Sequence, residues 1–399
     1  VDVQHRPAHV CGRGEALVKV SAVGVCATDV ELYEGSMGYF TAGLAQLPLI
    51  PGHEWTGQIV ALGEDAPPHL AVGQRVVGEH ATGCQPAPAA AVNNNSNYSN
   101  SLPALPGTKP VFANWNCRAC AISGGFLRCP RRLETGFFGR DGAFQTEIRF
   151  PSHQLHVLLE SVPWEVSVLA EPLAAAHKAV RLAGLEELGS NAPTSSPVRV
   201  AVVGDGPMGL LVVQVLRWKG ARVACVIGAS ASRLARAKEL GAEAVWNVAE
   251  QGTEGLWKAL EDELGELPPV AIEAAGHPSA MPTALGCVRP SGRLVLLGLS
   301  GNQLSEICMD DIVLKQLMVR GSLSSEPQDW RAVVQMLSSG AVQSIVTHTL
   351  RGLDKYVEAI EQVRKPPEGM LKLALLPNAE SADADAEAET PHGKRARHA

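Results

Sequence analysis

The feature that most restricts the fold of this chain is an apolar strand that runs into a glycine-rich turn and then into a helix. Residues 198–203 are almost continuously apolar, which is typical of a strand buried on both faces of a sheet. The motif GDGPMG follows, and residues 207–221 then have the composition of a helix. A buried strand that passes directly into a helix is the unit from which parallel sheets are built.

The same alternation of strand and helix continues downstream. Residues 221–229 are a second apolar strand, and residues 230–242 are an amphipathic helix that ends near a glycine. Residues 268–276 and 292–299 repeat the strand pattern. We therefore predict an α/β fold with a doubly wound parallel sheet in this region.

The residues before about Pro163 have a different composition, rich in valine, glycine and proline. Short alternating runs at 15–25, 56–63 and 74–80 predict strands, and many short strands of this kind predict a compact, barrel-like β domain. A chain of 399 residues is too long for one ordinary core, so two domains are expected.

Composition argues against several classes of function. The net charge is −7 with no basic stripe along the body, so nucleic acid is not an expected partner. The sequence has neither the run of about 18 apolar residues that spans a membrane nor a signal-peptide pattern, so neither membrane insertion nor secretion is expected. Nine irregularly placed cysteines indicate reduced thiols and metal ligands, which places the chain in the cytoplasm.

Three further motifs carry residues that suit zinc. Cys26 lies in GVCATD, His53 and Glu54 lie in PGHEWTG, and Glu171 lies in LAEPLAAA. A thiolate, an imidazole and a carboxylate leave the fourth position of a tetrahedral zinc open, as in catalytic sites. We therefore expect Cys26, His53 and Glu171 to hold a catalytic zinc. The alternative for Glu171 is an acid at a helix start, and Glu54 is interpreted as an outer-shell group or an exchanging ligand.

These motifs and GQRVVGE occur in the order found in a known family. The chain resembles the zinc-dependent alcohol, polyol and sugar dehydrogenase branch of the medium-chain dehydrogenase/reductase superfamily, which includes sorbitol, glucose and threonine dehydrogenases. The resemblance covers about residues 14–377. It implies a GroES-like β-barrel catalytic domain, split in sequence, around a Rossmann domain with a doubly wound parallel sheet, and a homo-dimer or homo-tetramer.

The implied domain limits follow from this order of motifs. The catalytic domain takes residues 1–175 and, after the Rossmann domain at 176–321, a return segment at 322–377. Residues 85–110, which are rich in asparagine, alanine and proline, predict a low-complexity insertion. Residues 378–399, acidic and then basic, predict a disordered tail.

The resemblance also implies a reaction. Zinc makes a bound alcohol more acidic, and hydride passes from the carbinol carbon to a nicotinamide ring. Thr28 corresponds to the family's proton-relay hydroxyl, with a solvent-capped or core threonine as the alternative. Where relay enzymes often carry a histidine, this chain has Glu31, which leaves the outer end of the relay open.

The glycine motif is the expected cradle of the cofactor, with the helix start offering N–H groups to phosphate. NAD enzymes place an acid at the end of the second strand, and this chain has Gly228 there. Hydroxyls and an arginine follow at Ser230, Ser232 and Arg233, so we favour NADP over NAD, with a solvent-exposed arginine as the alternative for Arg233. Lys372 is a weaker candidate for the pyrophosphate. The full predicted cofactor set is Gly204, Gly206, Pro207, Met208, Gly209, Gly228, Ser230, Arg233 and Gly298.

A second zinc is implied by the family's cysteine lobe. Cys84 takes the first ligand position, and the insertion lies between it and the remaining ligands, Cys117, Cys120 and Cys129. A longer loop costs little closure entropy, so a closed structural site survives the insertion in this interpretation. The alternative is a decayed lobe with free thiols.

The leading hypothesis is a zinc-dependent NAD(P) oxidoreductase of a polyol or sugar-like secondary alcohol. Within enzymes, the alternative is a dehydrogenase of bulkier apolar alcohols, with pocket walls from Trp55, Tyr39, Phe137 and Phe138, although such aromatics are more often core residues. A catalytically silent NAD(P)-binding protein is the alternative from a different class.

Overall fold

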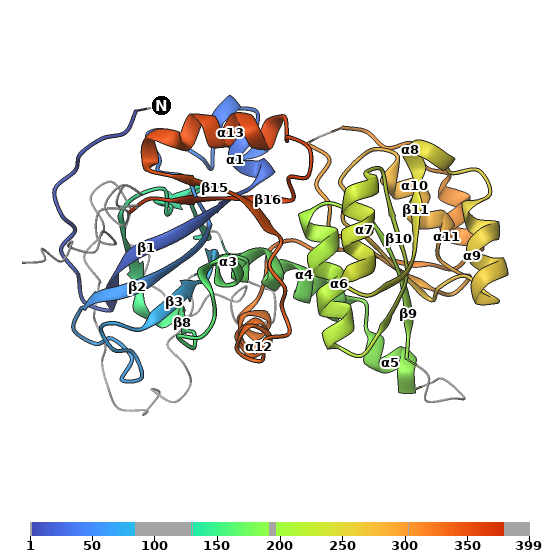
Figure 1. Ribbon diagram of the computed structural model, residues 1–399, viewed down its shortest axis with the longest axis horizontal. Helices are drawn as coiled ribbons and strands as arrows, with labels where there is room; N and C mark the ends of the chain where they lie inside the picture. Colours follow the sequence, from blue (N-terminus) through green and yellow to red (C-terminus); the bar gives the residue numbers. More distant parts are fainter. Residues whose placement is uncertain (1, 84–128, 130, 191–196, 302, 379–399) are drawn as a thin grey trace, which may run out of the picture.

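The computed structural model describes residues 2–83, 129, 131–190, 197–301 and 303–378. They form two lobes side by side, each built on one large sheet (Figure 1). The proposed insertion at 85–110 and all but Asn378 of the proposed tail at 378–399 lie outside the described residues. Within the described part of the chain, no helix combines the length and apolar character needed to cross a membrane.

The first lobe is a seven-stranded sheet centred on β1 (Glu15–Val25). This long strand pairs antiparallel with three others, β2, β7 and β16. The strand order is β15-β16-β1-β2-β3-β8, with β7 also on β1. The remaining strands of the lobe are β2 (Glu54–Leu62), β3 (Arg75–Gly78), β7 (Glu147–Pro151), β8 (Leu155–Val157), β15 (Val346–Arg351), β16 (Lys372–Leu376) and a small sheet of β4 (Ala81–Thr82), β5 (Leu133–Thr135) and β6 (Gly139–Arg140).

The pairing of β16 with β1 confirms that the catalytic domain is split in sequence. Val23 lies opposite Leu375, so the last strand of the chain completes the sheet that the first strand begins. Asn378 is also anchored here, since its Nδ2 donates to the carbonyls of Val20 and Thr146 at 2.8 Å each. The helices of this lobe are α1 (Ala27–Glu34), α2 (Gly38–Thr41), α3 (Trp164–Ser167), α12 (Pro327–Ser338), α13 (Tyr356–Arg364), η3 (Ser152–Gln154) and η4 (Leu353–Lys355).

The second lobe is a six-stranded parallel sheet in the order β11-β10-β9-β12-β13-β14. The strand order reverses between β9 and β12, and ligands bind at such a switch point beyond the carboxyl ends of the strands. The strands are β9 (Arg199–Val203), β10 (Arg222–Gly228), β11 (Ala242–Asn247), β12 (Val270–Glu273), β13 (Arg293–Leu296) and β14 (Met318–Gly321). The helices are α5 (Leu185–Ser190), α6 (Pro207–Trp218), α7 (Ala231–Glu239), α8 (Val248–Gln251), α9 (Leu256–Leu264), α10 (Ala280–Gly286) and α11 (Met309–Leu314).

Helix α4 (Ala170–Leu182) lies between the lobes and packs against α6 on one side and α12 on the other (Figure 1). A buried polar network fixes the α12 contact. The Asp329 carboxylate accepts from Arg181 at 3.0 and 3.1 Å and lies 2.8 Å from His177 Nδ1. These partners and the Glu326 backbone N–H lower the pKa of Asp329 although burial opposes the shift. The helix is therefore held at a defined position relative to both lobes.

Candidate active site

The pairing of β1 with β2 explains why two distant motifs meet. Gly24 lies opposite Glu54 in the antiparallel register, so Cys26, just beyond β1, lies near His53, just before β2. One ligand atom from each of Cys26, His53 and Glu54 lies within 4.8 Å of the others. His53 and Glu54 are buried and Cys26 is half-buried. A thiolate, an imidazole and a carboxylate at this spacing fit a zinc ion.

Asp29, which the sequence analysis did not single out, orients this cluster. It is fully buried at the third position of α1, and its Oδ2 accepts the backbone N–H of Cys26 at 2.8 Å. Its Oδ1 lies 3.6 Å from His53 Nδ1. Burial alone lowers the pKa of His53, but the charges of Asp29 and Cys26 outweigh it, and the net pKa is raised. A carboxylate behind a ligating histidine is the usual support of a metal-bound imidazole.

Lys372 on β16 reaches the cluster from the return segment. Its Nζ donates to Glu54 Oε1 at 2.7 Å, and both side chains are buried. Burial opposes the lysine charge, but Glu54 and Cys26 outweigh it and the pKa of Lys372 is raised. The structure therefore places Lys372 against Glu54, whereas from sequence it was a weaker candidate for the cofactor pyrophosphate.

Glu171, the predicted third ligand, lies outside the 4.8 Å cluster. It is in the first turn of α4, and its Oε1 lies 3.4 Å from Nδ1 of His80. Burial raises the pKa of the Glu171 carboxyl to about 7, and the charges of His53 and Glu54 also act on it. The structure thus brings Cys26 and His53 together with Glu54, and places Glu171 on a neighbouring wall of the same site.

His80 and Phe137 form an aromatic side of this site. The Phe137 ring centroid lies 4.5 Å from that of His53 and 5.1 Å from that of His80. Both ring nitrogens of His80 are buried without a hydrogen-bond partner among the described residues. Of the other aromatic residues proposed as walls, Tyr39 and Phe138 pack with Phe137 in one cluster, but Trp55 packs on Phe150 in the core, 2% exposed.

Thr28 and Glu31 lie one turn apart on α1, directly after Cys26, and both are half-buried. Burial and the nearby Glu34 charge raise the pKa of Glu31. A Cβ atom built on Gly301 would lie 3.7 Å from Glu31 Oε1, so this carboxylate faces the loop after β13 of the other lobe.

The predicted dinucleotide cradle has the expected backbone form. Gly206 caps α6, and Pro207 is its first residue. Gly204 has a φ of 128°, which favours glycine. A Cβ atom on Gly209 would overlap the carbonyl oxygen of Gly204, so the third glycine allows α6 to approach β9. Met208 packs on the core beneath the turn.

The sequence-based preference for NADP rests on residues at the end of β10. Gly228 is the last residue of the strand, and Ser230 Oγ lies 3.2 Å from Ser232 Oγ just beyond it. The Arg233 guanidinium donates to the carbonyl of Met370 at 3.2 Å. Asp205, the second residue of GDGPMG, accepts from the backbone of this segment, a contact that the sequence analysis missed.

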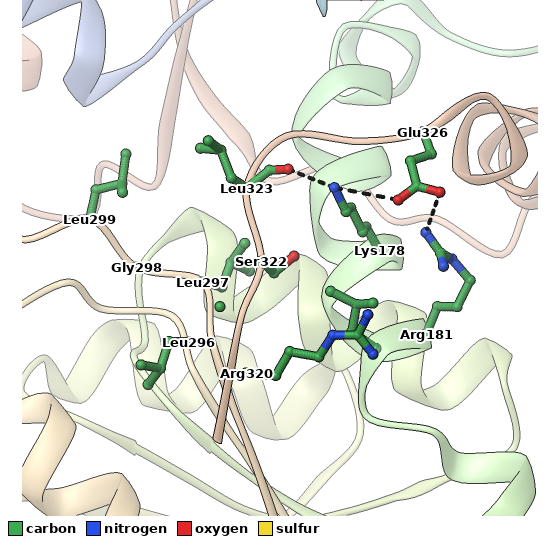
Figure 2. A pocket seen from close by; sticks show the side chains of 12 residues that line it. Lys178, Arg181, Leu296, Leu297, Gly298, Leu299, Arg320, Ser322, Leu323 and Glu326 are labelled. Atoms are coloured by element: carbon green, nitrogen blue, oxygen red, sulfur yellow. Dashed lines mark hydrogen bonds and ion pairs between the residues drawn. The ribbon is translucent and has the colours of Figure 1, made fainter. Parts of the chain in front are cut away.

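Gly298 lines a pocket of about 630 Å³ between α4 and the carboxyl ends of β13 and β14. Figure 2 shows Lys178 and Arg181 reaching into it from α4, with Lys178 bonded to the Leu323 carbonyl at 2.8 Å and to Glu326 at 3.6 Å. The pocket lies at the carboxyl edge of the parallel sheet, the edge at which dinucleotides bind.

The predicted structural zinc site is described only at Cys129, which is buried. Its proposed partners Cys84, Cys117 and Cys120 lie outside the described residues.

Comparisons with known proteins agree with this architecture. A zinc-binding dehydrogenase family model matches residues 207–339, and an alcohol dehydrogenase GroES-like domain model matches residues 12–108. The chain is 30% identical over 369 residues to an L-threonine 3-dehydrogenase of Pyrococcus abyssi, covering 91% of this chain and 92% of the relative. The chain belongs to the zinc-dependent medium-chain dehydrogenase/reductase family. Its relatives in this family include polyol dehydrogenases.

An erythritol/L-threitol dehydrogenase of Mycolicibacterium smegmatis is 29% identical over 377 residues, which is 91% of each chain. Among solved structures, an alcohol dehydrogenase of Escherichia coli CFT073 complexed with NADH has a TM-score of 0.73 and 26% identity, over 93% of this chain and 94% of that one. The 2R,3R-butanediol dehydrogenase of Bacillus subtilis has a TM-score of 0.72 at 23% identity, over 94% and 96%, and supports the fold. The predicted GroES-like and Rossmann architecture and the dehydrogenase class of the enzyme are thereby confirmed.

Proposed function

We propose that this family member oxidises a polyol or sugar-like secondary alcohol at a zinc held by Cys26, His53 and Glu54. The observation that carries the proposal is the buried meeting of these three donors, with Asp29 behind the histidine. Zinc, when bound, supplies the Lewis acidity that makes an alcohol hydroxyl easier to deprotonate. Asp29 keeps the His53 ring oriented, and Lys372 holds the Glu54 carboxylate in place through its hydrogen bond.

Glu171 is the predicted ligand whose role changes most. We propose that it serves as a wall group that hydrogen-bonds a substrate hydroxyl or exchanges with Glu54 at the metal. Its buried carboxyl, with a pKa raised to about 7, is able to donate as well as accept near neutral pH. Carboxyl groups at 54 and 171 favour a polyhydroxylated substrate over an apolar one.

The proton leaves along α1 in this proposal. Thr28 passes it to Glu31, because residues three apart on a helix lie on the same face. Burial of Glu31, which raises its pKa, brings that carboxyl closer to the pKa range of a proton acceptor near neutral pH.

The hydride partner is a nicotinamide dinucleotide held by the cradle at the start of α6. Ser230 and Arg233 favour a cofactor with a 2′-phosphate, and Asp205 opposes one. We further propose a second, structural zinc at Cys84, Cys117, Cys120 and Cys129, a homo-dimer or homo-tetramer, and a cytoplasmic location.

Metal analysis and a substrate screen test this function. We expect about two zinc ions per chain, as four-cysteine and catalytic sites each hold one. We expect faster oxidation of polyols and sugars than of bulky apolar alcohols. Preference for apolar alcohols would assign the Phe137, Phe138 and Tyr39 wall to the substrate. Zinc-free protein that still binds dinucleotide without turnover would contradict the proposal and favour a silent binding protein.

A further inference from the structure

The carboxylate of Asp205 occupies the place next to the end of β10 where a side chain at position 228 would lie. Gly228 has no side chain, and a Cβ atom built on it would overlap the Asp205 side chain. Asp205 Oδ2 accepts the backbone N–H of Ala229 at 2.9 Å and that of Ser230 at 2.7 Å. An acid from the glycine motif of β9 therefore stands beside the adjacent strand.

This position decides which dinucleotide fits. In dinucleotide-binding folds, an acid at the end of the second strand binds the ribose hydroxyls, and a 2′-phosphate needs donors and positive charge in the same place. Here Asp205 already uses two of the backbone N–H groups that a phosphate would need. Its negative charge also repels a phosphate. Both bonds use Oδ2, and Oδ1 is able to accept from a ribose hydroxyl.

The residues that favour a phosphate are less well placed. Arg233 donates to the carbonyl of Met370 at 3.2 Å, so its guanidinium is directed toward the return segment. The hydroxyls of Ser230 and Ser232 lie 3.2 Å apart and bind each other. In these arrangements, neither the arginine nor the serines compensate for the repulsion between the Asp205 carboxylate and a 2′-phosphate.

We propose that Asp205 is the ribose-binding acid of this enzyme, supplied from the glycine motif in place of residue 228, and that it makes the cradle prefer NAD to NADP. This deepens the proposed function and rests on it only in requiring a nicotinamide dinucleotide in this cradle. It reverses the preference for NADP that Gly228, Ser230 and Arg233 predicted from sequence.

Fluorescence titration of the purified full-length protein with NADH and with NADPH tests the proposal without turnover. The wild type should bind NADH at least about tenfold more tightly than NADPH, a ratio typical of one charged contact. Asp205→Asn keeps the size of the side chain but removes its charge, and should reduce that ratio to near one. Asp262→Asn, which removes the same charge from the exposed face of α9, should leave it unchanged. Tighter binding of NADPH by the wild type, or an unchanged ratio in Asp205→Asn, would overturn the assignment.

Moving the acid from position 205 to position 228 tests whether the carboxylate itself, and not the local backbone, selects the cofactor. Gly228→Asp alone should weaken both cofactors, because its Cβ overlaps Asp205. The double variant Asp205→Ala/Gly228→Asp should regain the preference for NADH. A double variant that binds both cofactors equally would show that the carboxylate does not discriminate between NADH and NADPH, and would contradict the proposal. Absence of binding of either cofactor to the wild type would defeat the proposed function itself.

Discussion

The metal cluster and the dinucleotide cradle depend on different chemical groups. The cluster depends on polar side chains that are buried or half-buried, and these are brought together from distant parts of the chain: Cys26, His53, Glu54 and Lys372. The cradle depends on backbone N–H groups and on the absence of side chains within a single strand–turn–helix unit. The metal cluster requires that its polar groups have partners of opposite charge, and the cradle requires open space next to the backbone. A substitution that damages one site should therefore leave the other intact.

The largest expected effect is the loss of a metal ligand. Cys26→Ser should reduce zinc content at the catalytic site and lower kcat/KM by about 1,000-fold or more, because metal catalysis supplies several kcal/mol of transition-state stabilisation. NADH affinity, measured by fluorescence, should change less than about threefold, since the cradle shares no residue with the cluster. A parallel loss of NADH binding would break the distinction between the two sites.

The next effect concerns the buried ion pair. Lys372→Met leaves Glu54 buried without its cation, and should lower the free energy of unfolding of the zinc-free protein by about 3–5 kcal/mol. Added zinc should recover part of this loss, because the metal replaces the missing positive charge. Lys355→Met removes an exposed partner of Glu358 and should cost less than about 1 kcal/mol by urea denaturation. Equal losses in both variants would mean that the buried pair contributes no more to stability than the exposed pair.

The Glu171 carboxyl makes stability depend on pH. Its pKa in the folded protein is raised from 4.5 to about 7, so the folded state binds a proton that the unfolded state has released. The stability of zinc-free protein should therefore be greatest below pH 4.5 for this group, and fall by up to about 3 kcal/mol as the pH rises to 7. Glu171→Gln should remove this contribution. Urea unfolding of both proteins at several pH values measures the difference, and parallel curves would contradict it.

The smallest effect probes the cradle. Gly209→Ala places a methyl group against the Gly204 carbonyl, and should destabilise the protein by about 1–3 kcal/mol and weaken NADH binding. Zinc content should stay at the wild-type value. Gly220→Ala serves as a control for a loss of stability outside the cradle, since Gly220 has a φ of 75° that disfavours alanine but open space around its Cβ position. Zinc loss in Gly209→Ala would show that the sites are coupled.

Sequence patterns are most informative where one residue type meets a local requirement. The glycines of GDGPMG lie between strand β9 and helix α6 in one unit of neighbouring residues, so their pattern is visible in a short window. Cys26 and His53 are rare donor types inside distinctive motifs. Asp29 could have been found, because an acid at the third position of a helix that starts after a cysteine caps that helix.

Other parts of the site leave no local pattern. Lys372 and Glu54 are 318 residues apart, and only the β16–β1 pairing brings them together. Glu171 was predicted as a ligand from its donor type and its place in LAEPLAAA, neither of which identifies its neighbours in space. Asp205 occupies the variable position of the glycine motif, and its reach to β10 depends on the spacing of adjacent parallel strands.

The antiparallel partnership of β1 and β16 has a consequence for biosynthesis. Strand β1, which leads into Cys26, emerges from the ribosome long before β16, yet it acquires this neighbour only when β16 appears. At ordinary elongation speeds this interval lasts on the order of tens of seconds, during which Val23–Val25 of β1 lack the partner that β16 provides, although β7 can already pair with Glu15–Lys19. The parallel-sheet lobe is complete earlier, so a nascent chain stalled before residue 346 should already recognise dinucleotide while its metal pocket still lacks Lys372.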